Sequence, residues 1–162
     1  MLRAILLLSV LFSLSPRSTV QDPRNDIQIT LERTICFGRC PIYRVTIRGD
    51  GSVTYEGWKF VKVEGTHGKK IPAAKVQELV RSFTDIDYFN LKDVYDSEIN
   101  ADGSMMTPTD MPMIITSLTL NGRSKRVEDS FGAPQKLLVL EKKIDQLAGT
   151  SMWVSGNASP AW

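Results

Sequence analysis

The chain has 162 residues, of which 42% are hydrophobic and 23% charged; these proportions indicate one ordinary globular domain and exclude a largely disordered chain. The whole chain carries 20 basic and 18 acidic residues. Residues 1–18 contain Arg3 and Arg17 and no acid, so the remainder has 18 of each. A domain without net charge gives no electrostatic reason to bind nucleic acid or anionic lipid.

The first residues have the pattern of a secretory signal peptide. Arg3 provides a positive start, and residues 4–14 form an uncharged, mostly apolar run. As a helix this run spans only ~17 Å, whereas the hydrocarbon core of a bilayer is about 30 Å thick. We therefore expect a signal peptide over residues 1–18, a disordered linker at 19–26, and export to the periplasm or the extracellular space. The mature chain is expected to have no membrane span. An uncleaved hydrophobic N-terminus is the alternative.

The chain has two cysteines, Cys36 and Cys40. An even count in an exported chain predicts a disulfide, which here closes a tight local loop around Gly38. A redox-active dithiol is the alternative, although the spacing is C-x-x-x-C rather than the C-x-x-C of thioredoxin-like motifs. A zinc site would need about two more ligands, and the chain has one histidine, His67. We therefore expect no metal at these cysteines.

Alternating apolar and polar residues predict strands before and after the cysteines. Residues 27–32 and 43–48 have a period of two, and the turn Gly49-Asp50-Gly51 follows the second run. An Asp-Gly pair between alternating runs is a strong signal for a β-hairpin. The return strand begins near Val53; we also expect a strand at 58–64 and a loop at 65–70.

Two helices are expected, each beginning at a proline, which suits the first turn of a helix. Pro72 opens the first, which ends near Thr84, and Pro134 opens the second. Both have an apolar stripe at helical spacing. The stripes consist of Val76, Leu79, Val80 and Phe83 in the first helix, and of Leu137, Leu138, Val139, Leu140, Ile144 and Leu147 in the second.

Between the two helices, strands at 114–120 and 123–131 flank Asn121-Gly122, a second hairpin signal. Together the elements predict an α+β domain over residues 27–148. It is an antiparallel sheet built from two or more hairpins, with two helices packed on one face. Residues 149–162 are rich in glycine, serine and alanine and include Trp153 and Trp162. We expect them to form a flexible tail.

The polar segment 93–112 is expected to be a long loop, and long loops in compact domains are often functional. From Glu98 onward, oxygen-bearing residues occupy positions 1, 3 and 5 and glycine position 6, as in a calcium loop. Thr109 stands where the bidentate glutamate belongs, so a solvated acidic loop is the competing interpretation. Asp110 is a candidate acid or base, or else a turn cap. The candidate residues of this loop are Asp96, Glu98, Asn100, Asp102 and Asp110.

Several short elements of the sequence occur in the order typical of one known family. They are Cys36-Phe37-Gly38-Arg39-Cys40-Pro41-Ile42-Tyr43, Gly49-Asp50-Gly51, Val53, Tyr55-Glu56-Gly57, Thr109-Asp110-Met111-Pro112 and Gly132-Ala133-Pro134. Through these elements the chain resembles a family of exported bacterial proteins known as domain of unknown function 6438. The resemblance covers roughly residues 27–147, Tyr95 also fits its pattern, and residues 98–108 look like an enlarged loop. It implies the fold and an exported setting but no activity.

No arrangement of residues in the sequence indicates catalysis. There is no G-x-S-x-G elbow and no phosphate-binding loop, and His67 has no evident carboxylate partner. We therefore favour a non-enzymatic, cofactor-free exported module that binds a protein, peptide or small molecule. The alternatives are an envelope thiol–disulfide enzyme using Cys36 and Cys40, and a divalent-cation-binding module using the acidic loop at 96–110.

Overall fold

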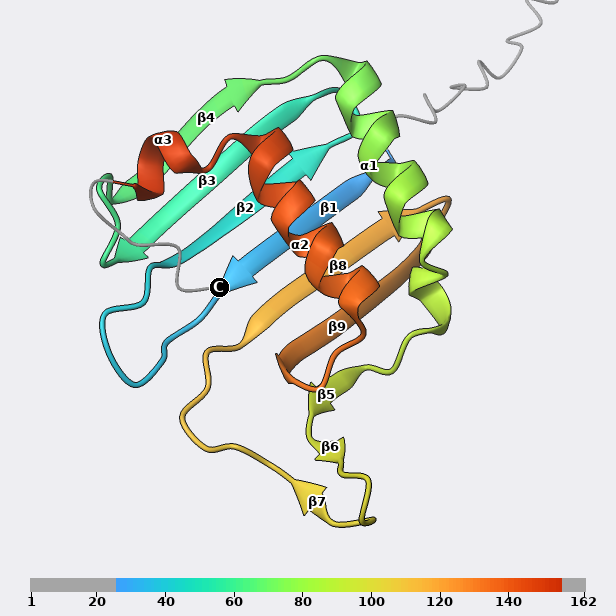
Figure 1. Ribbon diagram of the computed structural model, residues 1–162. Coiled ribbons are helices and arrows are strands. Elements are labelled where there is room, and N and C mark those ends of the chain that lie inside the picture. Colours follow the sequence, from blue (N-terminus) through green and yellow to red (C-terminus); the bar gives the residue numbers. More distant parts are fainter. Residues whose placement is uncertain (1–25, 156–162) are drawn as a thin grey trace, which may run out of the picture.

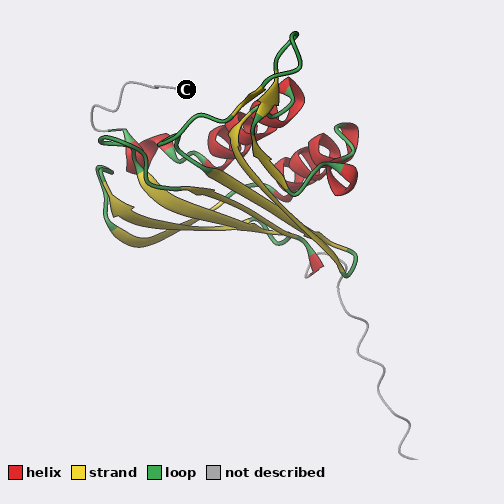
Figure 2. Ribbon diagram, turned by 90° about the horizontal axis from the view of Figure 1, so that it is seen from below, coloured by secondary structure: helices red, strands yellow, loops and turns green. Residues whose placement is uncertain are grey.

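The structure, a computed structural model, describes residues 26–155. One seven-stranded sheet carries both main helices, α1 (Ala73–Asp85) and α2 (Gln135–Ala148), on the same face (Figures 1 and 2). In spatial order the strands are β4 (Gly65–Lys70), β3 (Ser52–Lys59), β2 (Ile42–Arg48), β1 (Gln28–Arg33), β8 (Ile114–Leu120), β9 (Arg123–Phe131) and β5 (Val94–Asp96). The predicted α+β class, with hairpins in a mostly antiparallel sheet, is confirmed.

Two hairpin systems meet at the centre of this sheet. Strands β1 to β4 form a consecutive antiparallel meander, and β8 and β9 form a separate hairpin. Antiparallel pairing of β1 with β8 joins them, so β1 has a neighbour on both sides. Asn121 and Gly122 both have positive φ, 50° and 72°, as the tight β8–β9 turn requires. The sequence signal for this turn is therefore confirmed in its backbone geometry.

The alternation of side chains places the core between the sheet and the helices. Burial alternates along β1, β2 and β3, and the residues facing the helices are almost fully buried. From the helix side, Val76, Leu79 and Phe83 of α1 and Leu137, Leu140 and Ile144 of α2 pack onto them. The opposite face is lined by half-exposed polar residues such as Thr30, Thr46 and Thr54, so it faces solvent.

The edge strand β4 corrects two expectations. Residues 65–70, expected to be a loop, pair with β3 from Gly57↔Gly65 to Ser52↔Lys70. The strand expected at 58–64 is instead the end of β3 and a turn. The reason is that β4 lies at the edge and is exposed along almost its whole length, so it needs no apolar alternation.

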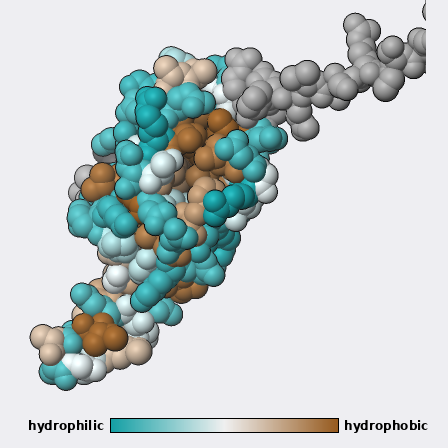
Figure 3. All heavy atoms as spheres, turned by 90° about the vertical axis from the view of Figure 1, so that its right-hand side faces the viewer, coloured by the Kyte–Doolittle hydropathy of each residue, from teal (hydrophilic) through white to brown (hydrophobic). Residues whose placement is uncertain are grey.

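The segment expected to be a structureless loop also contains strands. After α1 and the short 3-10 helix η2 (Tyr88–Asn90), strand β5 pairs in parallel with β9. The two-residue strands β6 (Glu98–Ile99) and β7 (Met105–Met106) then form a hairpin. Figure 3 shows this hairpin projecting below the body of the domain, with hydrophobic atoms near its tip. The exposed apolar residues there are Ile99, Met105 and Met106.

Residues 149–154 correct the expectation of a flexible tail beginning at Gly149. They turn back and form the short helix α3 (Ser151–Val154), and Trp153 is buried. Its ring stacks on Tyr55 at 4.8 Å between centroids, and its carbonyl accepts a hydrogen bond from the Val63 amide. Trp162 and the expected signal peptide lie outside the described residues. Within residues 26–155, no helix has the length and apolar character needed to cross a membrane.

We predict that Trp153→Ala lowers the free energy of unfolding by roughly 3–5 kcal/mol, because it empties a buried aromatic site beside Tyr55. Urea denaturation followed by circular dichroism measures the change. Met152→Ala, one residue away and exposed, is the matched control and should have an effect below about 0.5 kcal/mol. Equal effects of the two variants would show that α3 does not belong to the core.

Candidate functional site

One end of the sheet carries a row of polar side chains among the residues that face the helices. Neighbouring strands pair Tyr43 with Arg33, Arg33 with Ile114, and Ile114 with Asp129. Tyr95 on β5 is paired with Asp129 and extends the row to the edge of the sheet. Arg33 and Asp129 are only 6% and 5% exposed. Such burial is rare for charged residues, so each needs a partner or a function.

Helix α2 supplies the partner of Arg33. The guanidinium group donates to the Asp145 carboxylate, with Nη2 2.7 Å from Oδ2, and its Nε donates to the Tyr43 hydroxyl. Tyr43 and Thr150 in turn donate their hydroxyls to Oδ1 of Asp145. Burial disfavours the charge on Arg33, but Asp145 and Tyr43 outweigh it, so the pKa of Arg33 is raised. The pKa of Tyr43 is also raised, by burial and by Asp145.

Two further carboxyl groups are buried beside this network without a basic partner. Glu141 lies one helical turn before Asp145 and is 2% exposed, and its Oε1 accepts no hydrogen bond from the described residues. Burial, and then the charge of Asp129, raise the pKa of Glu141 to about 8. Burial raises the pKa of Asp129 to about 6. Near neutral pH, Glu141 therefore holds its proton while Asp129 is largely ionised.

These carboxyl groups line a cavity of about 610 Å³ at this end of the sheet. Its walls come from the ends of β1, β8 and β9, from the first half of α2, from β6 and from the segment before β8. The polar lining residues are Arg33, Glu98, Asp129, Ser130, Glu141 and Lys142, and the others are Met111, Pro112, Ile114, Phe131, Gly132, Ala133 and Leu138. The cavity is thus an apolar pocket with a few polar groups, which is the usual composition of a small-molecule site.

Gly132 allows the chain to close one side of this cavity. Its φ is +79°, and a Cβ there would lie 2.6 Å from the carbonyl oxygen of Ser97. A larger residue at this position would push apart the connection after β9 and the connection between β5 and β6. The absence of a side chain therefore lets Glu98 approach the pocket from β6.

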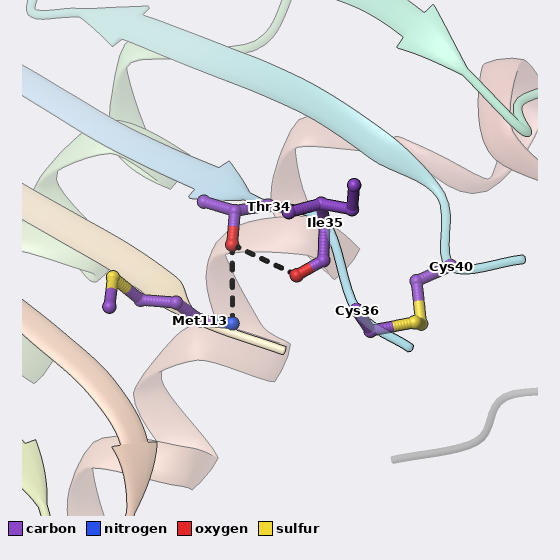
Figure 4. The surroundings of a disulfide bond; sticks show 5 residues. All are labelled: Thr34, Ile35, Cys36, Cys40 and Met113. Carbon is purple, nitrogen blue, oxygen red and sulfur yellow. Dashed lines mark hydrogen bonds between the residues drawn. A yellow bond between two sulfur atoms is a disulfide. The ribbon is translucent and has the colours of Figure 1, made fainter. Parts of the chain in front are cut away.

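The disulfide loop braces the other side. Cys36 and Cys40 form the expected disulfide, with their Cα atoms 5.9 Å apart. Figure 4 shows Thr34, just before the loop, beside Met113. The Thr34 amide donates to the Met113 carbonyl at 3.0 Å, and the Met113 amide donates to the Thr34 hydroxyl at 3.2 Å. The Phe37 amide also donates to the carbonyl of Asp110. The loop thus holds the segment that contributes Met111 and Pro112 to the pocket.

The structure separates the candidate residues of the acidic loop. Glu98 lines the pocket, and Tyr95 packs against the core at the end of the polar row. The others are exposed: Ser97 donates to Asp96, Asn100 donates to the Ser104 hydroxyl, and Asp102 accepts from Ser104. The backbone carbonyl of Asp110 accepts the Phe37 amide. Among residues 26–155, no three His, Cys, Asp or Glu side chains gather in a group that could hold a metal ion.

A family model for domain of unknown function DUF6438 matches residues 27–148. The chain belongs to the DUF6438 family. A search of curated proteins found no match. The match covers the sheet and both main helices, including every charged residue of the polar row and of α2 described above. It stops before α3, so the packing of Trp153 on Tyr55 extends beyond the matched DUF6438 region.

The sequence interpretation missed the buried charges, although a signal was present. On α2, Glu141 falls on the same stripe as Leu137, Ile144 and Ala148, and it is buried whereas the expected stripe residue Val139 is 55% exposed. On the strands, Arg33 continues the inward alternation of Ile29 and Leu31, and Asp129 that of Val127. A charged residue at an inward position is the pattern that predicts a polar site.

We predict that Glu141→Gln removes a pH dependence of folding stability. The folded protein keeps the Glu141 proton up to about pH 8, whereas the unfolded chain loses it near the ordinary value of 4.5. Stability is therefore fully present below pH ~4.5 and is lost as the pH rises through ~8, by on the order of a few kcal/mol. The variant should flatten this decline, as measured by urea denaturation at several pH values between 4.5 and 9.

The matched control is Glu64→Gln, which changes an exposed glutamate outside the pocket. It should leave the decline of stability with pH as it is in the wild type. The same decline in Glu141→Gln would show that Glu141 is ionised in the folded protein throughout this range.

Proposed function

We propose that this domain is an exported binding module and that its ligand is a small molecule held in the pocket between β9, α2 and residues 111–114. The observation that carries the proposal is a cavity of about 610 Å³ that is lined with buried carboxyl groups beside the middle of the polar row. Cavities of ~300–1,000 Å³ are the usual size of ligand sites. A protein, peptide or small molecule fitted the sequence equally well, and the size of the cavity favours the small molecule.

The chemistry of the pocket supports binding more strongly than structural packing. A structural role for Glu141 would give its buried Oε1 a donor, yet that oxygen has none among the described residues. Burial without compensation lowers stability, and such costs are found at functional sites. The pocket therefore contains a group whose hydrogen-bonding capacity is available to a ligand.

No comparable observation supports the alternative of a thiol–disulfide enzyme. Cys36 and Cys40 lie in the irregular connection between β1 and β2, whereas reactive cysteines with a lowered pKa are found at helix N-termini or beside basic groups. Their loop is hydrogen-bonded to Asp110 and follows the Thr34–Met113 pair, and Met113 lies between the pocket residues Pro112 and Ile114. A bracing role for the disulfide is consistent with these contacts.

The proposal that the protein is exported rests on its N-terminal sequence and on the disulfide. The positive, apolar N-terminal run has the pattern of a signal peptide, and disulfides persist in oxidising compartments. When the full chain is expressed in a bacterium with a periplasm, we predict that the periplasmic protein lacks about 18 N-terminal residues. Intact mass measured after alkylation, with and without prior reduction, should show two alkylated cysteines only after reduction. A full-length cytoplasmic product with free thiols would contradict export.

Blocking the pocket tests binding. We predict that a library of small fragments, screened by ¹H–¹⁵N NMR, shifts amide resonances around Ser130, Gly132 and Leu138 in the wild type. Leu138→Trp places an indole in the cavity and should abolish these shifts. Val139→Trp adds the same indole at the next, exposed position, which does not line the pocket, and should leave them unchanged. Shifts that survive Leu138→Trp would place the binding site elsewhere.

A further inference from the structure

We infer that the pocket selects an organic cation: a ligand with an ammonium group that binds Glu141 and Asp129 and an apolar body that lies against the hydrophobic walls. This inference rests on the proposed function, since it names the ligand class of the same pocket. It is carried by the balance of charge at the buried end, by the unpartnered oxygen of Glu141 and by the composition of the walls.

The buried end of the pocket has an excess of acidic groups. Arg33 is balanced by Asp145 through the 2.7 Å ion pair. Asp129 and Glu141 take part in none of the ion pairs formed among residues 26–155. When all four groups are ionised, one positive and three negative charges lie at this end. A cation is the ligand that reduces this imbalance, and buried charges are tolerated when paired.

The hydrogen-bonding capacity of the pocket also matches a donor. Oε1 of Glu141 is buried and has no hydrogen bond from the described residues, so it can accept one from a ligand. An ionised carboxylate is only an acceptor, whereas an ammonium group is only a donor. The bond between them is charge-assisted, which makes it stronger than a bond between neutral groups.

The apolar walls favour an organic cation over a metal ion. Calcium takes six to eight oxygen ligands and magnesium keeps several waters, and neither gains from hydrocarbon contact. The walls around Asp129 and Glu141 are formed by hydrophobic side chains: Met111, Pro112, Ile114, Phe131, Ala133 and Leu138. Such walls bury an alkyl or aryl group while the two carboxyl groups receive the amine.

An anionic ligand is disfavoured by where the positive charges lie. Arg33 already binds Asp145 and Tyr43. Lys142 is exposed at the rim, and Glu98, also exposed, carries the opposite charge there. An anion that entered the pocket would meet Asp129, which is largely ionised near neutral pH.

Binding of a cation should displace the proton of Glu141. The charged and titratable groups around Glu141 are Arg33 on β1, Tyr88 on η2, Asp129 on β9, and Lys142 and Asp145 on α2. None of these neutralises Glu141 in the free protein, and its pKa of about 8 keeps it protonated at pH 7. A bound ammonium group lowers that pKa, so the carboxyl group releases its proton to solvent while the amine keeps its own.

The test compares three probes of nearly the same size on the full mature protein at pH 7: 2-phenylethylamine, 2-phenylethanol and 3-phenylpropionate. NMR titration gives the affinities and locates the shifts. The amine should bind about ten- to a hundredfold more tightly than the alcohol, and the carboxylate most weakly. Calorimetry in phosphate and in Tris, whose ionisation enthalpies differ, should show release of up to one proton per amine bound.

The variant Glu141→Gln should remove most of the preference for the amine and the proton release, while Glu64→Gln should change neither. Pocket shifts with equal or tighter binding of the alcohol or the carboxylate would overturn this inference and leave the proposed function standing. Amine binding without proton release, or with its preference intact in Glu141→Gln, would also overturn it. If none of the three probes shifts the pocket resonances, the inference and the proposed function both fall.

Discussion

The burial of Arg33 at the end of the central strand β1 is the constraint on which the rest of this structure depends. A guanidinium group removed from water needs a charged partner, and Asp145 of α2 provides it. The same carboxylate accepts the hydroxyls of Tyr43 and Thr150, so it joins β1, β2, α2 and the residue before α3. Apolar packing alone would allow α2 to shift along the sheet, whereas this network specifies where it lies. Once α2 is fixed, Glu141 faces the end of β9, and the pocket follows.

The pocket contains more acid than the fold needs. One carboxylate satisfies Arg33, yet Asp129 and Glu141 are buried at the same end, where burial raises the pKa of both and the charge of Asp129 raises that of Glu141 further. Apolar residues at both positions would continue the stripes of β9 and α2 and extend the core without this cost. The site therefore combines one compensated charge pair, which organises the fold, with two buried carboxyl groups that take part in none of the ion pairs among residues 26–155 and for which we propose a ligand as the partner.

Much of the architecture follows from local sequence, because alternation, proline-initiated helices and the Asp-Gly and Asn-Gly turns act over a few residues. The edge strand β4 escaped prediction because exposed Gly65–Lys70 needs no apolar pattern, and β5 because its pairing with β9 joins distant segments. Trp153 was predicted to belong to a flexible tail because its burial depends on stacking against Tyr55, which is distant in the sequence. For the site, the sequence pattern predicted candidate residues in the long acidic loop, whereas the buried charged residues at the pocket are Arg33, Asp129 and Glu141. Each lies at an inward position, but their convergence depends on strand register and the placing of α2.

The features by which the chain resembles its family frame this pocket. Met111 and Pro112 of one matching element and Gly132 and Ala133 of another line the cavity. Tyr43, the last residue of the cysteine element, binds Arg33 and Asp145, and the disulfide loop is hydrogen-bonded to Asp110. Elements separated by up to about 90 residues in the chain therefore meet at one end of the sheet. The frame is thus the part of the molecule that the family resemblance describes, whereas the carboxyl groups of Asp129 and Glu141, on which the proposed ligand preference depends, lie outside those elements.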